Sequence, residues 1–295
     1  MSKEIEIIYV RPRQFEYLIR IYTKKGHPLP GDYVTGVLDK ATYIVNYPID
    51  IGRKTLQTYF RHLSYYPITF FPGETIFADP NGVYFCKEDN KNNCAGVDVV
   101  YGRDLPEIVP ENYVVQKEIL PLLHNNVKFD MRVLCCIRRD GYIYFYKNIF
   151  YRFSTREYTG SAEKIEQLSI PIHLNPYVKE HGLKFKNFFE YDQRGRMNYK
   201  NYVSQLQWKL KEIYASILPH ANSLTTGDLS KFFMIIGMDF IPDSNDDLCL
   251  LELNSISGWD TRNGIHNYRH FYDEVTKFIL GKTINSHFGE ILSIY

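Results

Sequence analysis

Three side chains with oxygen ligands lie on two apolar segments in the second half of the chain. Asp239 lies in FFMIIGMDFIP (232–242), and Glu252 and Asn254 lie in LCLLELN (248–254). Carboxylate and carboxamide oxygens are hard ligands, of the kind that Mg²⁺ uses together with phosphate oxygens and water. These three residues are therefore candidate ligands of Mg²⁺, and ordinary polar strand ends are the alternative.

The spacing of these residues predicts how they face. Residues i and i+2 of a strand project to the same side, so Glu252 and Asn254 project together, while Leu251 and Leu253 face the apolar side. If the polar stretch DSNDD closes a hairpin, Asp239 lies beside the other two across the ladder. Two carboxylates near a core are costly to bury unless they are paired or bind a cation.

Two further groups of residues have the charge to bind phosphate. In KFDMRV, the alternate residues Lys128, Asp130 and Arg132 share one face of a predicted strand and form a row of one acidic and two basic groups. Lys87 ends the apolar GVYFC and precedes a polar loop that closes at Gly96, so its ammonium can contact nucleotide phosphates that the loop covers. The alternative for Asp130 and Arg132 is a surface ion pair.

A polar hinge follows the apolar residues 113–115. Gln116, Lys117 and Glu118 stand where a strand ends, and their side chains and backbone can offer donors and acceptors to the edge of an adenine. A strand end in solvent is the alternative. No Walker motif and no GxGxxG occurs in the chain, so neither of these phosphate-binding loops is predicted.

The elements that must position these residues are mostly strands. The pattern of apolar residues predicts strands near 4–10, 42–45, 82–89, 97–101, 113–120, 128–137, 142–153, 232–242 and 248–254. Residues 201–218 have the apolar spacing of a helix, as do 53–63 and 268–279 more weakly. Arg138 to Gly141 reads as a hairpin turn. The chain is therefore predicted to be α+β, with antiparallel hairpins dominating its second half.

Composition limits the compartment and the partners. The 295 residues carry a net charge of +1, so no global field calls for nucleic acid or a membrane surface, and we expect neither as a partner. No run is long and apolar enough to predict a membrane span. The five cysteines show no metal-ligand spacing, and no secretory signal precedes them, so we expect reduced thiols in the cytoplasm.

Taken in order, these segments resemble the tubulin–tyrosine ligase family of ATP-grasp enzymes. The resemblance spans about Ile51 to Ile279 and rests on collinear segments of the chain. These are RKTLQTYFRHL, YYPITF, YFCKEDNKNNCAGVDVV, VVQKEI, KFDMRV, YRFSTREY, IHLN and GMDFIPDSNDDLCLLELN. KFDMRV is the most specific of them.

The resemblance implies an ATP-grasp fold with three lobes, in which ATP is held between two antiparallel-rich β-sheets. On this basis we expect an N-terminal lobe over 1–65, a central ATP-grasp lobe over 66–115, and a C-terminal ATP-grasp lobe with the metal site over 116–295. We also expect a monomer.

The resemblance further implies an ATP-dependent carboxylate–amine ligase that forms an amide through an acyl phosphate. The roles it implies are catalytic for Lys128, Asp130, Arg132 and Arg152, nucleotide-binding for Lys54, Lys87, Gly96, Gln116, Lys117 and Glu118, metal-binding for Asp239, Glu252 and Asn254, and substrate-binding for Asn175. The implied cofactors are ATP and Mg²⁺. The implied substrates are an amino acid and a protein acceptor, with tubulin or another acidic tail as the expected acceptor.

Two alternatives remain open. An ATP-grasp ligase that joins small molecules would need no protein acceptor. A nucleotide-binding pseudoenzyme on the same fold would bind ATP without chemistry, although the presence of all three metal-ligand types argues against it. Fold analogy alone does not choose among these functions.

Overall fold

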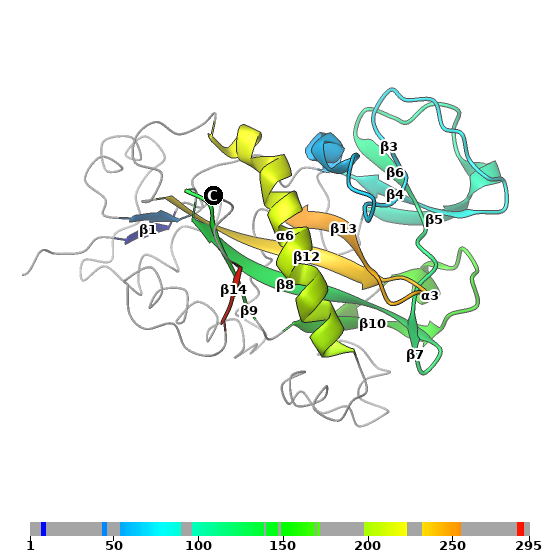
Figure 1. The fold of residues 1–295 in the computed structure, drawn as a ribbon. Helices are drawn as coiled ribbons and strands as arrows, with labels where there is room; N and C mark the ends of the chain where they lie inside the picture. Colours follow the sequence, from blue (N-terminus) through cyan, green and yellow to red (C-terminus); the bar gives the residue numbers. More distant parts are fainter. Residues whose placement is uncertain are drawn as a thin grey trace, which may run out of the picture.

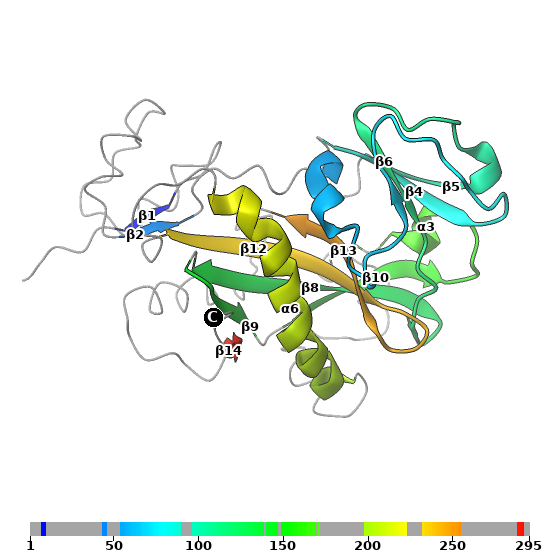
Figure 2. The same ribbon diagram turned by 45° about the horizontal axis from the view of Figure 1, so that its top comes forward.

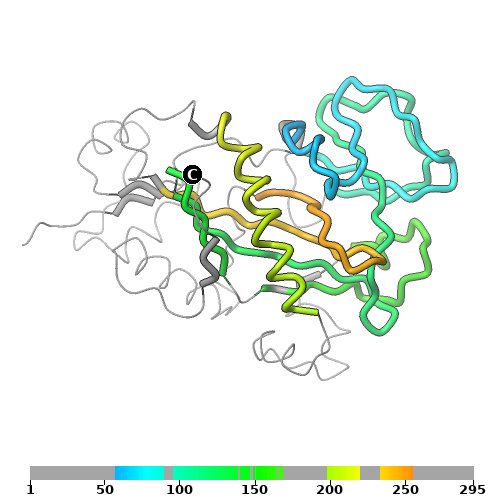
Figure 3. Tube along the Cα trace, viewed as in Figure 1, coloured from blue at the N-terminus to red at the C-terminus, as the bar shows by residue number. Residues whose placement is uncertain are grey.

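Two β-sheets and one long helix make up most of the structure, which is a computed structural model. It describes residues 7–9, 43–45, 54–89, 96–138, 140–146, 149–168, 170–171, 198–222, 232–254 and 288–291 (Figure 1). Figure 3 shows the path of the chain as a tube in the same view. The predicted α+β class with mostly antiparallel sheets is confirmed. The predicted helix over 268–279, Asn175 and most of the N-terminal segment 1–65 lie outside the described residues.

The larger sheet has ten strands and carries most of the core. Its strands are β1 (Ile7–Tyr9), β2 (Tyr43–Val45), β7 (Leu123–His124), β8 (Val127–Arg138), β9 (Tyr142–Tyr146), β10 (Phe150–Glu157), β11 (Ile170–Pro171), β12 (Phe232–Pro242), β13 (Leu248–Asn254) and β14 (Phe288–Ile291). β8 lies at its centre, between β12 and β10, with antiparallel pairing on both sides. β13 pairs with β12 and forms an edge of the sheet.

The smaller sheet has four antiparallel strands in the order β3-β6-β4-β5. They are β3 (Thr69–Phe70), β4 (Val83–Glu88), β5 (Val97–Tyr101) and β6 (Tyr113–Lys117). This sheet has its own small core of Tyr84, Val109 and Val115. Figure 1 shows it beyond the end of the large sheet, beside the β12–β13 hairpin. The two sheets therefore meet where β13 and β6 approach each other.

The long helix α6 (Tyr199–Asn222) confirms the helix predicted from apolar spacing. Its apolar face is fully buried against β8 and β12, and Figures 1 and 2 both show it crossing these strands. The remaining helical elements are short: η2 (Lys54–Phe60), η3 (Gly102–Asp104) and α3 (Lys164–Gln167). η2 is a 3-10 helix with a kink at Gln57, where we had expected an ordinary helical segment. No helix in the described ranges is long and apolar enough to cross a membrane.

Alternation along β8 decides which residues face the functional side. Residues 127, 129, 131 and 133 are buried in the main core under α6. Lys128, Asp130 and Arg132 therefore share the opposite face, as predicted from their spacing. The predicted hairpin after β8 is also confirmed, because the Gly141 N–H donates to the Arg138 carbonyl at 2.9 Å and Gly141 has φ of 108°.

The turn between β12 and β13 is fixed to α6 by polar contacts. Asp246 has φ of 66° and accepts hydrogen bonds from Asn198 Nδ2 and Tyr202 Oη, both at 2.6 Å. The Asp246 carbonyl accepts a bond from Gln205 Nε2 at 2.8 Å. Lys209 Nζ donates to the Leu248 carbonyl at the start of β13. One face of α6 thus holds the hairpin that carries the predicted metal ligands.

Candidate functional site

The site is built around Asp239, where β8, β10, β12 and β13 lie side by side. Register places Asp239 opposite Arg132 of β8 on one side and opposite Glu252 of β13 on the other. Arg152 of β10 stands opposite Asp130 of β8. The hairpin predicted from the sequence, with Asp239 beside Glu252, is confirmed. Four strands thus bring charged residues from distant parts of the chain to one face.

Asp239 is a buried carboxylate held by two arginines. Arg132 binds it in a bidentate manner, with Nε to Oδ1 and Nη2 to Oδ2 both at 2.7 Å. Arg152 Nη2 lies 3.0 Å from Oδ2. Burial alone would raise the pKa of Asp239, which is 2% exposed, but the charges and hydrogen bonds of Arg132 and Arg152 outweigh it and lower the pKa. Asp239 is therefore a permanent anion at neutral pH.

Arg152 links this pair to a second carboxylate. Its Nε donates to Asp130 Oδ1 at 2.5 Å while its other end reaches Asp239. Burial would lower the pKa of Arg152, but the charges of Asp130 and Asp239 raise it well above the ordinary value. The guanidinium groups of Arg132 and Arg152 are planar and always charged, which suits them to hold phosphate oxygens.

Glu252 and Asn254 complete the candidate metal site. Asn254 Nδ2 donates to Glu252 Oε1 at 3.1 Å and to Asp239 Oδ2 at 3.4 Å. A half-turn of the amide would present its oxygen at the same place, beside two carboxylates. Within the described ranges, no three histidine, cysteine, aspartate or glutamate side chains form a metal cluster. The donor set therefore fits Mg²⁺ only when phosphate oxygens and water complete the shell, which is the shell that Mg²⁺ prefers.

A β-bulge in β13 corrects the predicted facing of the strand. Phe240 pairs with Leu250 and Asp239 pairs with Glu252, so Leu251 is an extra residue on this side of the ladder. Leu250 and Leu253 enter the core and Leu251 does not, although strict alternation had predicted Leu251 and Leu253 there. Because of this bulge, Leu250 and Leu253 both face the core although they are three residues apart, and Glu252 still faces Asp239.

The small sheet contributes a polar group directly across from the bulge. Gln116 of β6 accepts a hydrogen bond from Lys87 Nζ at 2.6 Å through its Oε1. Its Nε2 donates to Thr69 Oγ1 at 3.2 Å and reaches the carbonyl of the bulged Leu251 at 3.5 Å. The Lys87 ammonium and the predicted metal strand are therefore joined through one side chain. Both Gln116 and Lys87 were candidate nucleotide ligands from the sequence.

Lys128 is placed differently from the other members of its row. Its Nζ donates to Glu118 Oε1 at 3.1 Å and to Gln167 Oε1 of α3 at 2.6 Å, and it lies 4.8 Å from the ring centroid of Phe85. Burial lowers the pKa of the Lys128 amine, and the charge of Glu118 opposes this. Lys128 thus ties β8 to the hinge and to the small sheet, and this brings Glu118 to the boundary between the sheets.

The remaining candidates are placed less fully. Gly96 begins the approach to β5, and its carbonyl accepts a hydrogen bond from the Glu88 N–H at 2.7 Å. Lys117 ends β6, and its N–H donates to the Ile68 carbonyl at 2.8 Å. Lys54 begins η2, but its side chain lies outside the described part of the structure, as does the whole of Asn175. No contact of Lys54 or Asn175 with the cluster is therefore described.

Sequence reasoning missed two buried glutamines beside these residues. Gln167 binds Lys128, and Gln57 of η2 binds the backbone of Leu253 between the candidate metal ligands. Neither glutamine stands at a spacing that marks it as functional. Gln57 lies 196 residues from its partner, so only the folded chain reveals the contact.

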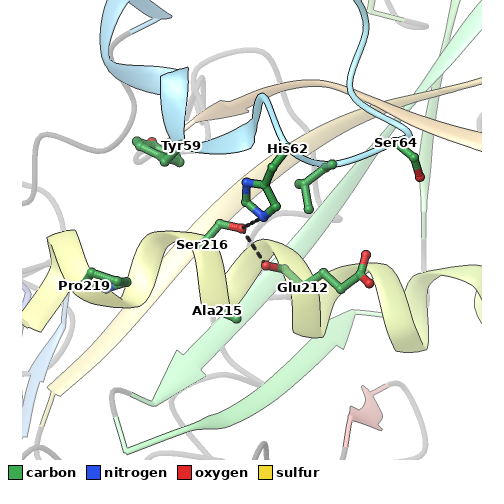
Figure 4. A pocket seen from close by; sticks show the side chains of 8 residues that line it. Tyr59, His62, Ser64, Glu212, Ala215, Ser216 and Pro219 are labelled. Atoms are coloured by element: carbon green, nitrogen blue, oxygen red, sulfur yellow. Dashed lines mark hydrogen bonds between the residues drawn. The ribbon is translucent and has the colours of Figure 1, made fainter.

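A separate cavity of about 460 Å³ lies between the segment after η2 and α6 (Figure 4). It is lined by Tyr59, His62, Leu63, Ser64, Glu212, Ala215, Ser216 and Pro219. Ser216 Oγ donates to the Glu212 carbonyl at 2.8 Å and lies 3.3 Å from His62 Nε2. A bond from a serine hydroxyl to the carbonyl four residues earlier is usual inside a helix.

Comparison with known proteins bears on the cluster around Asp239. A family model described as the tubulin-tyrosine ligase family matches residues 74–286. The matched range contains β4 to β13 and every residue of the cluster, whereas η2 precedes it. A search of curated proteins finds no significant match to this chain.

Proposed function

Since this chain belongs to the tubulin-tyrosine ligase family, as its motifs predicted, we propose that it is an ATP-dependent ligase that adds an amino acid to a protein carboxylate. The family supports amide-bond ligase chemistry with ATP, and the acceptor is our proposal. We further propose the three-lobed ATP-grasp arrangement, with ATP between the small and large sheets. An acidic tail, such as that of tubulin, is the acceptor we propose.

One observation carries the proposal. Two guanidinium groups, three carboxylates and a carboxamide from four strands face one another at the end of the large sheet that approaches the small sheet. Phosphoryl transfer needs little covalent help from a protein and depends on positioning and on the neutralisation of charge. A site of this composition supplies both.

In the proposed reaction, the γ-phosphoryl group moves to the acceptor carboxylate as ADP leaves, and the amine then displaces inorganic phosphate and loses a proton. Asp239, Glu252 and Asn254 would hold Mg²⁺. The ion supplies charge neutralisation at the phosphates. Arg132 and Arg152 would stabilise the transferred phosphoryl oxygens, for which purpose Asp130 orients Arg152.

The small sheet would hold the nucleotide. Lys87 would contact the phosphates, and Gln116 and Lys117 would bind the adenine edge at the hinge. Lys128 and Glu118 would brace the two sheets around the bound nucleotide, because their ion pair joins β8 to the end of β6. Lys54, Gly96 and Asn175 remain proposed ligands from the family resemblance.

The proposal is tested by ADP release from Mg²⁺–ATP, measured with a pool of amino acids in the presence and absence of a cell protein extract. We expect release to require both the amino acids and the extract, and a radiolabelled amino acid to enter protein. The same assay on Glu111→Gln, which changes an exposed glutamate two residues before β6, should give the wild-type rate.

Other outcomes of this assay select the alternatives. Release with amino acids alone would indicate a ligase of small molecules. Binding of Mg²⁺–ATP without release under any condition would indicate a nucleotide-binding pseudoenzyme. Failure to bind Mg²⁺–ATP at all would overturn the proposed site.

A further inference from the structure

In the part of the chain that the structure describes, the outer edge of β13 is covered by side chains and backbone from other elements rather than by another strand. Gln205 Oε1 accepts a hydrogen bond from the Leu248 N–H at 2.7 Å. The Leu250 N–H donates to the Tyr65 carbonyl at 2.9 Å, and the Leu251 carbonyl is reached by Gln116. An uncovered edge would leave buried backbone groups without partners and free to shift.

Gln57 covers this edge at the end that carries the candidate metal ligands. Its Nε2 donates to the Leu253 carbonyl at 3.0 Å, and its Oε1 lies 3.5 Å from the Leu253 N–H. One side-chain amide therefore contacts both backbone groups of a single residue, as the opposite residue of an antiparallel neighbouring strand would. Gln57 is 1% exposed, and it occupies the kink of η2 with φ of −77° and ψ of 21°.

The position of Leu253 gives this contact its consequence. Leu253 stands between Glu252 and Asn254, and β13 ends at Asn254. Among the described residues, the hydrogen bonds on the outer edge of 252–254 come from Gln57. Rotation of the Leu253 peptide groups would turn both neighbouring side chains away from Asp239.

We infer that Gln57 is a positioning residue for the metal ligands: its amide replaces a missing strand, fixes the backbone of Leu253, and so aims Glu252 and Asn254 at one cation. The inference rests on the proposed function, which identifies the ion as Mg²⁺. Outer-shell partners that orient metal ligands typically affect metal affinity by about 10–100-fold when they are removed.

The test compares Gln57→Met with Gln205→Met. Both glutamines are buried, at 1% and 7% exposure, and both bind the backbone of the same edge of β13, but Gln205 lies at its other end. The measurement is the Mg²⁺ concentration needed for half-maximal binding of a non-hydrolysable ATP analogue, followed by calorimetry. We expect Gln57→Met to raise this concentration by about 10-fold or more, and Gln205→Met to leave it near the wild-type value. Both variants should lower the thermal midpoint.

An equal shift in the two variants, or no shift in Gln57→Met, would overturn the inference, because the amide would then serve stability alone. If Gln57→Met does not fold, Gln57→Asn provides the second variant, since its neutral amide adds no buried charge but is one methylene shorter and cannot reach both backbone groups of Leu253. An unchanged Mg²⁺ requirement in Gln57→Asn would likewise overturn it. If the wild type binds the analogue equally well with and without Mg²⁺, that result would instead overturn the proposed function.

Discussion

Replacement of Glu252 by glutamine is expected to lower the rate of Mg²⁺-dependent ADP release by roughly 10²–10³-fold, the effect of removing one preorganised charge-stabilising group. Glutamine keeps the shape of the side chain and its hydrogen bond with Asn254, but it lacks the charge that a divalent cation needs. The fold should be retained, since the side chain is only half-buried on the site face of β13.

The measurement is steady-state ADP release at saturating amino acid and acceptor, with thermal unfolding of the same preparations. Glu111→Gln provides the matched control, because it removes one glutamate charge from an exposed position. A wild-type rate of ADP release in Glu252→Gln would show that Glu252 is not a metal ligand. A loss of rate in the exposed variant as well would point to a general effect of charge.

The second large effect is expected from Asp239→Asn, which should lower the free energy of unfolding by about 3–5 kcal/mol, the usual cost of breaking a buried ion pair from one side. Arg132 and Arg152 both bind this carboxylate, and the neutral amide would remove the anion that the two guanidinium groups share, leaving Asp130 and Glu252 as the nearby carboxylates. The control is Asp140→Asn, because the Asp140 side chain is 28% exposed whereas that of Asp239 is 2% exposed, so the cost should be below about 1 kcal/mol. Urea unfolding followed by circular dichroism measures both.

The same variant gives a pH dependence with a definite sign. The pKa of Asp239 is lower in the folded protein than its ordinary value of 3.8. Its stabilisation is therefore complete at pH values well above the unfolded pKa and is lost as the pH falls below about 4 toward the folded pKa. The difference in unfolding free energy between wild type and Asp239→Asn should be constant from pH 6 to about pH 5 and shrink at pH 3. A difference that grows at low pH would contradict the assigned direction.

Alternation made part of this site predictable from the sequence. The period of two in KFDMRV placed Asp130 and Arg132 on one face, and the two apolar segments around DSNDD required a hairpin with Asp239 beside Glu252. These conclusions needed only local periodicity and the length of the turn. The family resemblance implied only that Arg152 belongs to the site, and its pairing with Asp130 was not predicted because it depends on the order of strands in the sheet.

Other features lay beyond local patterns. The bulge at Leu251 depends on which leucines the core accepts, since Leu250 and Leu253 are both buried at a spacing of three residues. Lys128 pairs with Glu118 and Gln167 because the hinge and α3 come close to β8 only in the folded chain. Gln57 and Gln167 belong to no charge pattern that periodicity would detect, so their burial beside the site could not be anticipated.

The extra residue in β13 has a consequence for how this strand tolerates insertions and deletions among related chains. Without Leu251, Leu250 would still lie opposite Phe240 and Glu252 opposite Asp239, and only the carbonyl that meets Gln116 would be lost. A deletion at Leu253 would instead put Asn254 into the register of a core leucine. Loss of one residue is therefore tolerable at Leu251 and damaging at Leu253. Homologous strands that are one residue shorter should align with their gap at Leu251.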